Sequence, residues 1–116
     1  MGKHLSRTVA EGRAFMQVID GKPVDALSGE RIEVVSPSDG VAFASIPSSG
    51  AADVDRAVKA ARRAFDVGPW GRMPAVERGR RLTKLYQLVE ANGEELAALE
   101  SRDTGKPVRQ GKADIT

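Results

Sequence analysis

The sequence contains no cysteine and only one histidine, His4. Without cysteine, the 116 residues hold no disulfide, no thiolate metal site and no cysteine nucleophile. Aromatic residues make up only 4% of the chain, so its core would rest on smaller aliphatic side chains. These deficits predict a marginal core, or one that a partner or further chain completes.

Long apolar runs are also missing. No run approaches the roughly 18 residues that span a membrane, and residues 1–13 do not have the apolar core of a signal peptide. Neither sign of charge dominates, because 18 Lys and Arg stand against 16 Asp and Glu. This balance is not typical of nucleic-acid-binding proteins. We therefore predict a cytoplasmic chain with no membrane partner and no nucleic-acid partner.

The order of turn and apolar patterns predicts the α/β class. Residues 1–14 are polar and basic and are interpreted as an N-terminal arm, either frayed or a short helix. Apolar and turn patterns then predict strands over residues 15–19, 22–24, 31–35 and 41–46, with a hairpin turn at Asp20-Gly21. Helical spacing follows over residues 50–67, 74–91 and 94–104. A strand-rich first half thus precedes a helical second half.

Asp103 is the most informative polar residue. It shares one helix face with Leu96 and Leu99, at spacing i, i+3 and i+7, and the leucines should face the core. A buried carboxylate needs hydrogen bonds, an ion pair or a bound cation. Two interpretations stay open: Asp103 accepts backbone N–H groups of a neighbouring loop, or it is a ligand of a monovalent cation. No nucleophile, base and orienting group accompany it, so a catalytic role is not predicted.

Two other patterns resemble ligand sites only superficially. Lys106 follows Gly105, but a P-loop needs Gly-Lys-Ser/Thr at a helix N-terminus, whereas Pro107 follows here. Basic residues over 56–63 and 78–84 lack interleaved aromatic residues and are interpreted as solvated helix faces. A G-x-G-x-x-G motif after a strand is also missing. We therefore assign no catalytic and no cofactor-binding residue.

Several short motifs follow one another along the chain. They are, in order, Ile19-Asp20-Gly21-Lys22, Val34-Val35-Ser36-Pro37, Asp39-Gly40, the helical run 53–65, Gly68-Pro69-Trp70, Arg78-Gly79-Arg80, the run 95–100, Asp103-Thr104-Gly105-Lys106-Pro107 and Asp114-Ile115. Their order resembles the N-terminal portion of the NAD(P)-dependent aldehyde dehydrogenase superfamily, and the resemblance covers residues 15–116. No motif is decisive alone, but their order and spacing together are specific.

The resemblance implies an incomplete domain. Residues 15–116 would be the N-terminal part of a truncated, Rossmann-like coenzyme-binding domain, whose helices pack on a sheet supplied by later chain. The parent enzyme would oxidise an aldehyde to a carboxylic acid with NAD or NADP, through a cysteine thioester, and would form a homo-oligomer when full length. Since the catalytic residues would lie downstream, the chain alone is expected to be inactive scaffold. A stand-alone interaction module derived from this family is the alternative.

The resemblance also implies one partial site. Many family members bind Na⁺ or K⁺ through a carboxylate matching Asp103, backbone oxygens near the position of Val34, and a later residue. One departure from the family pattern concerns the loop beside this site. Ser36 stands where asparagine usually precedes the proline. We therefore expect this loop to lose one side-chain hydrogen bond.

Overall fold

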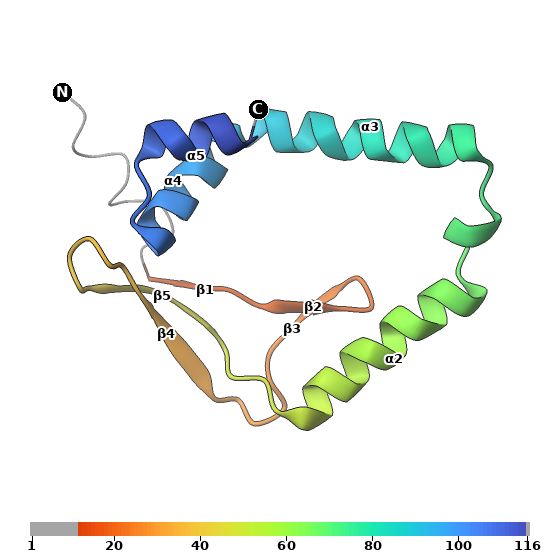
Figure 1. The fold of residues 1–116 in the computed structure, drawn as a ribbon. Coiled ribbons are helices and arrows are strands. Elements are labelled where there is room, and N and C mark those ends of the chain that lie inside the picture. The colour runs from red at the N-terminus through yellow and green to blue at the C-terminus, as the bar shows by residue number, and fades with distance from the viewer. Residues whose placement is uncertain (1–11, 116) are drawn as a thin grey trace.

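The strands and helices follow one another around an open ring (Figure 1). The computed structural model describes residues 12–115. Five short strands precede the helices: β1 (Arg13–Ala14), β2 (Gln17–Ile19), β3 (Lys22–Val24), β4 (Arg31–Val35) and β5 (Ala42–Pro47). The helices are α2 (Ala51–Val67), the 3₁₀ turn η1 (Trp70–Arg72), α3 (Ala75–Ala91), α4 (Gly93–Thr104) and α5 (Val108–Ile115). The predicted α/β class is confirmed.

The strands form two small sheets. In the first, β5 lies between β1, which is parallel to it, and β4, which is antiparallel. In the second, β2 and β3 form an antiparallel hairpin. Its turn places Asp20 at φ 55° and Gly21 at φ 72°, the left-handed geometry that an Asp-Gly turn favours. The predicted hairpin is therefore correct, although its first strand begins at Gln17 instead of Phe15.

The predicted arm over residues 1–14 lies largely outside the described residues. Its last two residues, Arg13 and Ala14, form β1 and pair with Ala44 and Ser45. A two-residue strand has no apolar alternation to detect, and it pairs with a partner about 30 residues away in the chain. Sequence periodicity therefore gave no indication of this strand.

Arg31 joins the strands through its guanidinium group. Nη1 donates to Asp25 Oδ1 at 2.8 Å, and Nε donates to Ser45 Oγ at 2.9 Å. Nη2 donates to the backbone oxygens of Ser45 and Phe15. One side chain on β4 thus holds β5 and the segments on either side of the hairpin together.

Asp53 fixes the start of α2. Asp53 is 2% exposed, and its carboxylate accepts the N–H of Gly50 at 3.1 Å and the N–H of Leu27 at 3.1 Å. The first contact satisfies a free donor at the helix N-terminus. The second ties α2 to the loop between β3 and β4.

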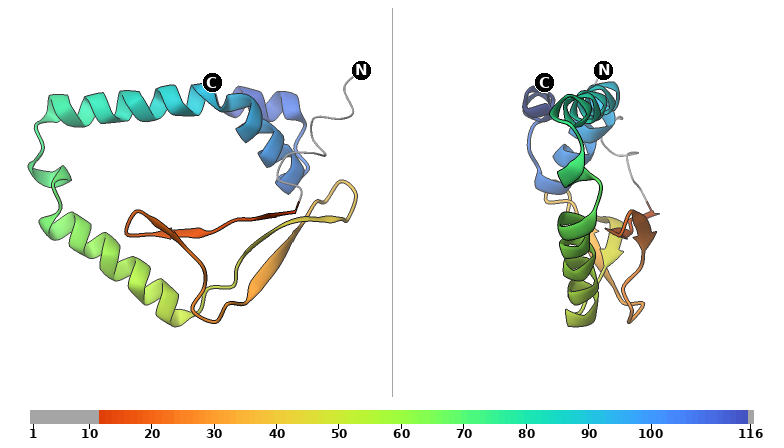
Figure 2. Two further views of the ribbon diagram at one scale, coloured as in Figure 1. Left: turned by 180° about the vertical axis from the view of Figure 1, so that it is seen from behind. Right: turned by 90° about the vertical axis from the view of Figure 1, so that its right-hand side faces the viewer.

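The chain is flat and open. Its principal extents are 50 × 38 × 16 Å, and the thin edge is visible in Figure 2. The radius of gyration is 17.4 Å, whereas a compact domain of this length has about 13 Å. The surface area is 8752 Å², against about 6100 Å² for a folded monomer of this mass. The chain therefore exposes apolar surface that folded domains normally bury.

Helix α3 shows this exposure best. None of its residues is buried, and Leu82, Leu85 and Leu88 are 56%, 57% and 53% exposed. The predicted apolar stripe is present, but within residues 12–115 nothing covers it. No helix in this described part combines the length and apolar content needed to cross a bilayer.

Candidate functional site

An apolar hollow of about 590 Å³ separates the β4–β5 sheet from helices α4 and α5. It contains both residues of the predicted cation site, Val34 from β4 and Asp103 from α4. The other lining residues are Phe15, Phe43, Ala44, Ile46, Leu96, Leu99, Glu100 and Ile115. The fold thus brings together two residues that lie far apart in the sequence.

The prediction that Asp103 is buried is wrong. Asp103 is exposed within the described chain, and the buried face of α4 instead carries Ala97, Ala98 and Arg102. Ala97 packs against α5, where a Cβ built on Gly111 would lie 3.2 Å from the Ala97 oxygen. The small alanines permit this close approach, so α4 turns its leucines and Asp103 toward the hollow. The shared face of Leu96, Leu99 and Asp103 was predicted correctly, but not its surroundings.

The oxygen atoms of the Asp103 carboxylate and of the Val34 backbone are of the kind found in alkali-cation sites. A carboxylate and a backbone oxygen are hard ligands of the kind that such ions prefer. The β4–β5 ladder is irregular between Val34 and Val35, and such irregularities locally disrupt ladder hydrogen bonds. Among the described residues, no group of three or more His, Cys, Asp or Glu gathers as a metal cluster. Val34 and Asp103 therefore line the same hollow, and a cation role for them stays a prediction.

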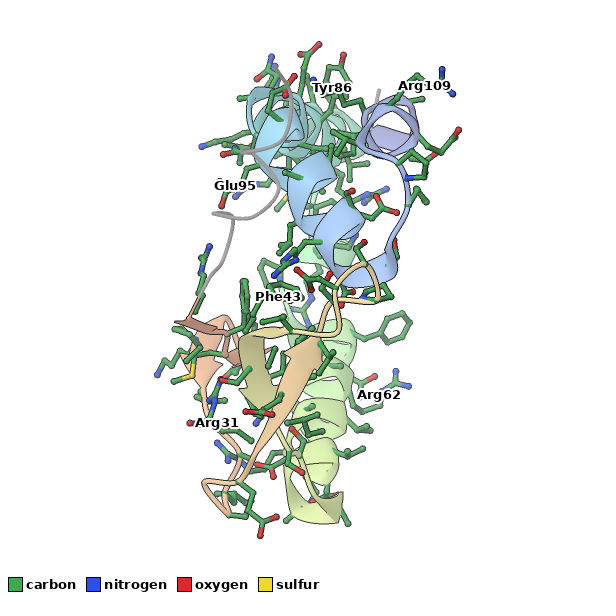
Figure 3. The ribbon with its side chains drawn as sticks, turned by 90° about the vertical axis from the view of Figure 1, so that its left-hand side faces the viewer. Arg31, Phe43, Arg62, Tyr86, Glu95 and Arg109 are labelled. Atoms are coloured by element: carbon green, nitrogen blue, oxygen red, sulfur yellow. The ribbon has the colours of Figure 1, made fainter. Side chains whose placement is uncertain are left out.

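Sequence reasoning missed Arg102, a buried arginine next to Asp103 on α4. Its Nη1 lies 2.7 Å from Asp39 Oδ2, and its guanidinium carbon lies 5.1 Å from the centre of the Phe43 ring. Figure 3 shows Phe43 pointing from β5 toward α4. The spacing of Ala98 and Arg102, i and i+4, was an available signal. It was overlooked because arginine is rarely buried.

Ser36 lies fully buried in the turn after β4, next to Pro37 and Asp39. Its Oγ and the Nε of Arg102 have no hydrogen-bond partner within the described structure. This agrees with the expectation that serine at this position leaves the loop one side-chain hydrogen bond short.

Lys106 is engaged by two carboxylates. Its Nζ lies 2.6 Å from Asp114 Oδ2 and 2.7 Å from Glu100 Oε1. The hydrogen bond that Lys106 donates to Asp114, and then the one that it donates to Glu100, raise the pKa of Lys106, while Lys106 holds the pKa of Asp114 below its usual value. Lys106 therefore clamps α5 to α4.

The basic helix rows form ion pairs at the surface. Lys59 pairs with Asp55 at 2.7 Å. Arg62 pairs with Asp66 at 2.6 Å, and Arg80 pairs with Glu77 at 3.2 Å. These exposed pairs at spacing i and i+3 or i+4 match the predicted solvated helix faces.

Comparisons with known proteins agree with the motif order. The profile of the aldehyde dehydrogenase family matches residues 24–116. The mitochondrial aldehyde dehydrogenase family 2 member B4 of Arabidopsis thaliana is 47% identical over 93 residues, which are 80% of this chain and 17% of that protein.

Solved structures give the same result. The NAD-dependent aldehyde dehydrogenase of Sinorhizobium meliloti is 44% identical, with a TM-score of 0.87 over 92% of this chain and 22% of its own. The betaine aldehyde dehydrogenase of Staphylococcus aureus, solved in complex with NAD⁺, is 31% identical, with a TM-score of 0.83 over 86% of this chain and 20% of its own. The chain thus spans about a fifth of the length of these relatives. By the family match and these likenesses, the chain belongs to the aldehyde dehydrogenase family.

Proposed function

We propose that the chain acts as the N-terminal part of an NAD(P)-dependent aldehyde dehydrogenase, in which it supplies scaffold and one side of a monovalent cation site. The observation that carries the proposal is the family match over residues 24–116, within a chain that spans about a fifth of its relatives. Bound NAD(P)⁺ would supply the hydride acceptor for oxidation of the aldehyde. The residues of this chain would support the fold of the enzyme and would not take part in the reaction.

The scaffold role is supported by the distribution of apolar surface. Two amphipathic helices, α2 and α3, leave Val58, Leu82, Leu85 and Leu88 more than half exposed. Helices of α/β domains normally bury such stripes on a sheet. In the proposed enzyme, later parts of the polypeptide would cover these stripes, and the complete chains would assemble as a cytoplasmic homo-oligomer.

The cation role is supported by the placement of Asp103 and Val34 on one hollow. In the proposed enzyme, the Asp103 carboxylate and the Val34 backbone oxygen would bind Na⁺ or K⁺ together with a ligand from later chain. The ion would neutralise the carboxylate beside an otherwise apolar lining. Its role would therefore be structural, joining α4 to the sheet.

A chimeric enzyme tests the scaffold proposal. Residues 12–116 replace the matching segment of the Sinorhizobium meliloti enzyme, to which they are 44% identical. We expect the chimera to retain aldehyde-dependent NAD⁺ reduction and the 116-residue chain alone to show none. The same chimera carrying Leu82→Ser, Leu85→Ser and Leu88→Ser should lose activity, because the α3 stripe could no longer pack.

Two results would contradict the proposal. One is turnover by the purified 116-residue chain. The other is a folded, NAD⁺-binding chimera that does not oxidise aldehydes, which would favour the alternative of a stand-alone interaction module.

A further inference from the structure

Arg102 connects the two elements that carry the proposed cation ligands. It directly precedes Asp103 on α4, and it is 5% exposed. Its partner Asp39 lies in the turn that follows β4, the strand of Val34. The ion pair measures 2.7 Å, and the Phe43 ring of β5 lies against the same guanidinium group. One buried side chain thus contacts both the turn after β4 and the neighbouring strand.

A second contact holds the same two elements together. Gly105 ends α4 with φ 76°, and a Cβ built there would lie 3.0 Å from Pro37 Cγ. The end of α4 is therefore seated on the β4–β5 turn on both sides of Asp103. Because Arg102 and Gly105 flank Asp103 in sequence, these contacts hold the backbone at Asp103 against the turn that follows β4.

Stability alone is a weak explanation for this pair. Removing a guanidinium group from water is costly, and a buried ion pair often stabilises a protein less than apolar side chains of the same volume would. Here the cost is greater because Arg102 Nε has no partner among the described residues. The alternative role of a buried ion pair is to fix the relative position of the elements that it joins.

We propose that Arg102 and Asp39 are positioning residues for the cation site, which set the distance between the Asp103 carboxylate and the Val34 backbone oxygen. This inference rests on the proposed cation role. Neither residue touches the ion. Groups that orient metal ligands typically change metal affinity by about 10–100-fold when they are altered.

The experiment uses the chimeric Sinorhizobium meliloti enzyme that carries residues 12–116 of this chain. Its melting temperature is measured against NaCl and KCl, with choline chloride keeping the ionic strength constant, since a ligand of the folded state raises the melting temperature with concentration. The concentration dependence gives an apparent Kd for each cation. ²³Na relaxation reports binding without relying on activity or unfolding.

Four variants separate positioning from folding. Arg102→Met and Asp39→Asn should each raise the apparent Kd about 10–100-fold, and Arg102→Lys, which keeps the charge, should raise it less. Arg109→Met is the matched control, because Arg109 is exposed on α5 and points away from the strands (Figure 3). This control should leave the Kd unchanged. If Arg102→Met does not fold, Asp39→Asn and Arg102→Lys still give the result.

Asp103→Asn distinguishes failure of this inference from failure of the cation role. If the unaltered enzyme shows no specific response to Na⁺ or K⁺, or if Asp103→Asn keeps that response, both proposals are overturned. If Asp103→Asn abolishes the response while the Arg102 and Asp39 variants keep the original Kd, only the positioning inference is overturned. Lower melting temperatures with an unchanged Kd would mark the pair as purely structural.

Discussion

Helices α3 and α4 are neighbours in the chain, yet their surroundings differ sharply. Helix α4, together with α5 and the turn 36–40, forms a region that we call the packed corner. It contains Ala97, Gly111 and Arg102, all buried. Helices α2 and α3, with the turn between them, form an open arm over residues 51–91, where α3 has no buried residue.

The difference shows that the size of apolar side chains does not decide burial here. The three leucines of α3 are more than half exposed, while small residues and one arginine are buried at the corner. Close approach of α4 and α5 requires alanine and glycine, whereas leucines pack only where a second layer exists. The following predictions test this contrast, beginning with the largest expected effect.

A bulky side chain should affect the two regions differently. Gly111→Leu places atoms against the backbone of Ala97, and overpacking of this kind costs about 2–3 kcal/mol. Gly79→Leu on α3 is the matched control, because a Cβ there meets nothing within 4 Å. Leucine has higher helix propensity than glycine, so this change should stabilise the chain by up to about 1 kcal/mol. Urea denaturation measures the free energy of unfolding of both variants. An equal loss in the two would contradict the difference in packing between the packed corner and the open arm.

The open arm should depend on the anchor of α2. Asp53→Ala leaves the N–H groups of Gly50 and Leu27 without their acceptor and should cost about 2 kcal/mol. The neighbouring Asp55 is exposed and forms a surface ion pair with Lys59. Asp55→Ala should therefore change the free energy of unfolding by less than about 0.5 kcal/mol. Thermal melts of both variants test this, and a smaller loss for Asp53→Ala than for Asp55→Ala would refute it.

Hydrogen exchange should separate the two helices directly. Isolated helices of this length are marginal in water, and α3 has little tertiary packing to add. We expect the amides of α3 to exchange at least about tenfold faster than those of α4 in the 116-residue chain. Mass spectrometry of peptic fragments gives both rates, and equal protection would mean that packing does not control local stability.

The clamp at Lys106 should respond to pH from both sides. Lys106 lowers the pKa of Asp114 from 3.8. The stability that this ion pair contributes is therefore present above pH 3.8 and is lost as pH falls through the folded-state pKa of Asp114. The pKa of Lys106 is raised above 10.5, so its contribution is lost only as pH rises through the folded value. The effect on stability should be small, because the groups are near the surface.

Carboxyl ¹³C NMR measures this coupling. In Lys106→Met, the pKa of Asp114 should rise toward its ordinary value, whereas Lys84→Met on α3 should leave it unchanged. An unchanged pKa in Lys106→Met would show that the clamp does not persist in solution.

The smallest effect is expected at Ser36. Its hydroxyl is buried and makes no hydrogen bond within the described residues. Ser36→Ala should therefore be neutral within about 0.5 kcal/mol, or slightly stabilising. A loss above about 1 kcal/mol in a urea titration would reveal a partner for this hydroxyl.

Local chemistry made much of the fold predictable. The Asp20-Gly21 turn predicted the hairpin, and the strands over 22–24 and 31–35 were predicted with their observed bounds. Each signal depends on neighbouring residues, which sequence patterns report well. The contact of Asp53 with Leu27, which joins α2 to the loop between β3 and β4, was not predicted.

Long-range contacts account for what was missed. Three contacts were not predicted: the pairing of β1 with β5, the ion pair of Arg102 with Asp39 and the hydrogen bonds of Arg31. Each joins residues from different segments, and the periodicity within one segment carries no information about such contacts. The misplaced burial of Asp103 has the same origin. Which face of α4 is covered depends on Gly111 of the next helix, and no pattern within α4 reports that.

The 16 Å thickness of the chain bears on how it is made. A helix with its side chains is about 10–12 Å across, so this plate has room for little more than one layer. In a longer polypeptide, this segment leaves the ribosome before the layer that covers it has been synthesised. Its leucine-lined helix would then be a natural binding surface for chaperones during that interval.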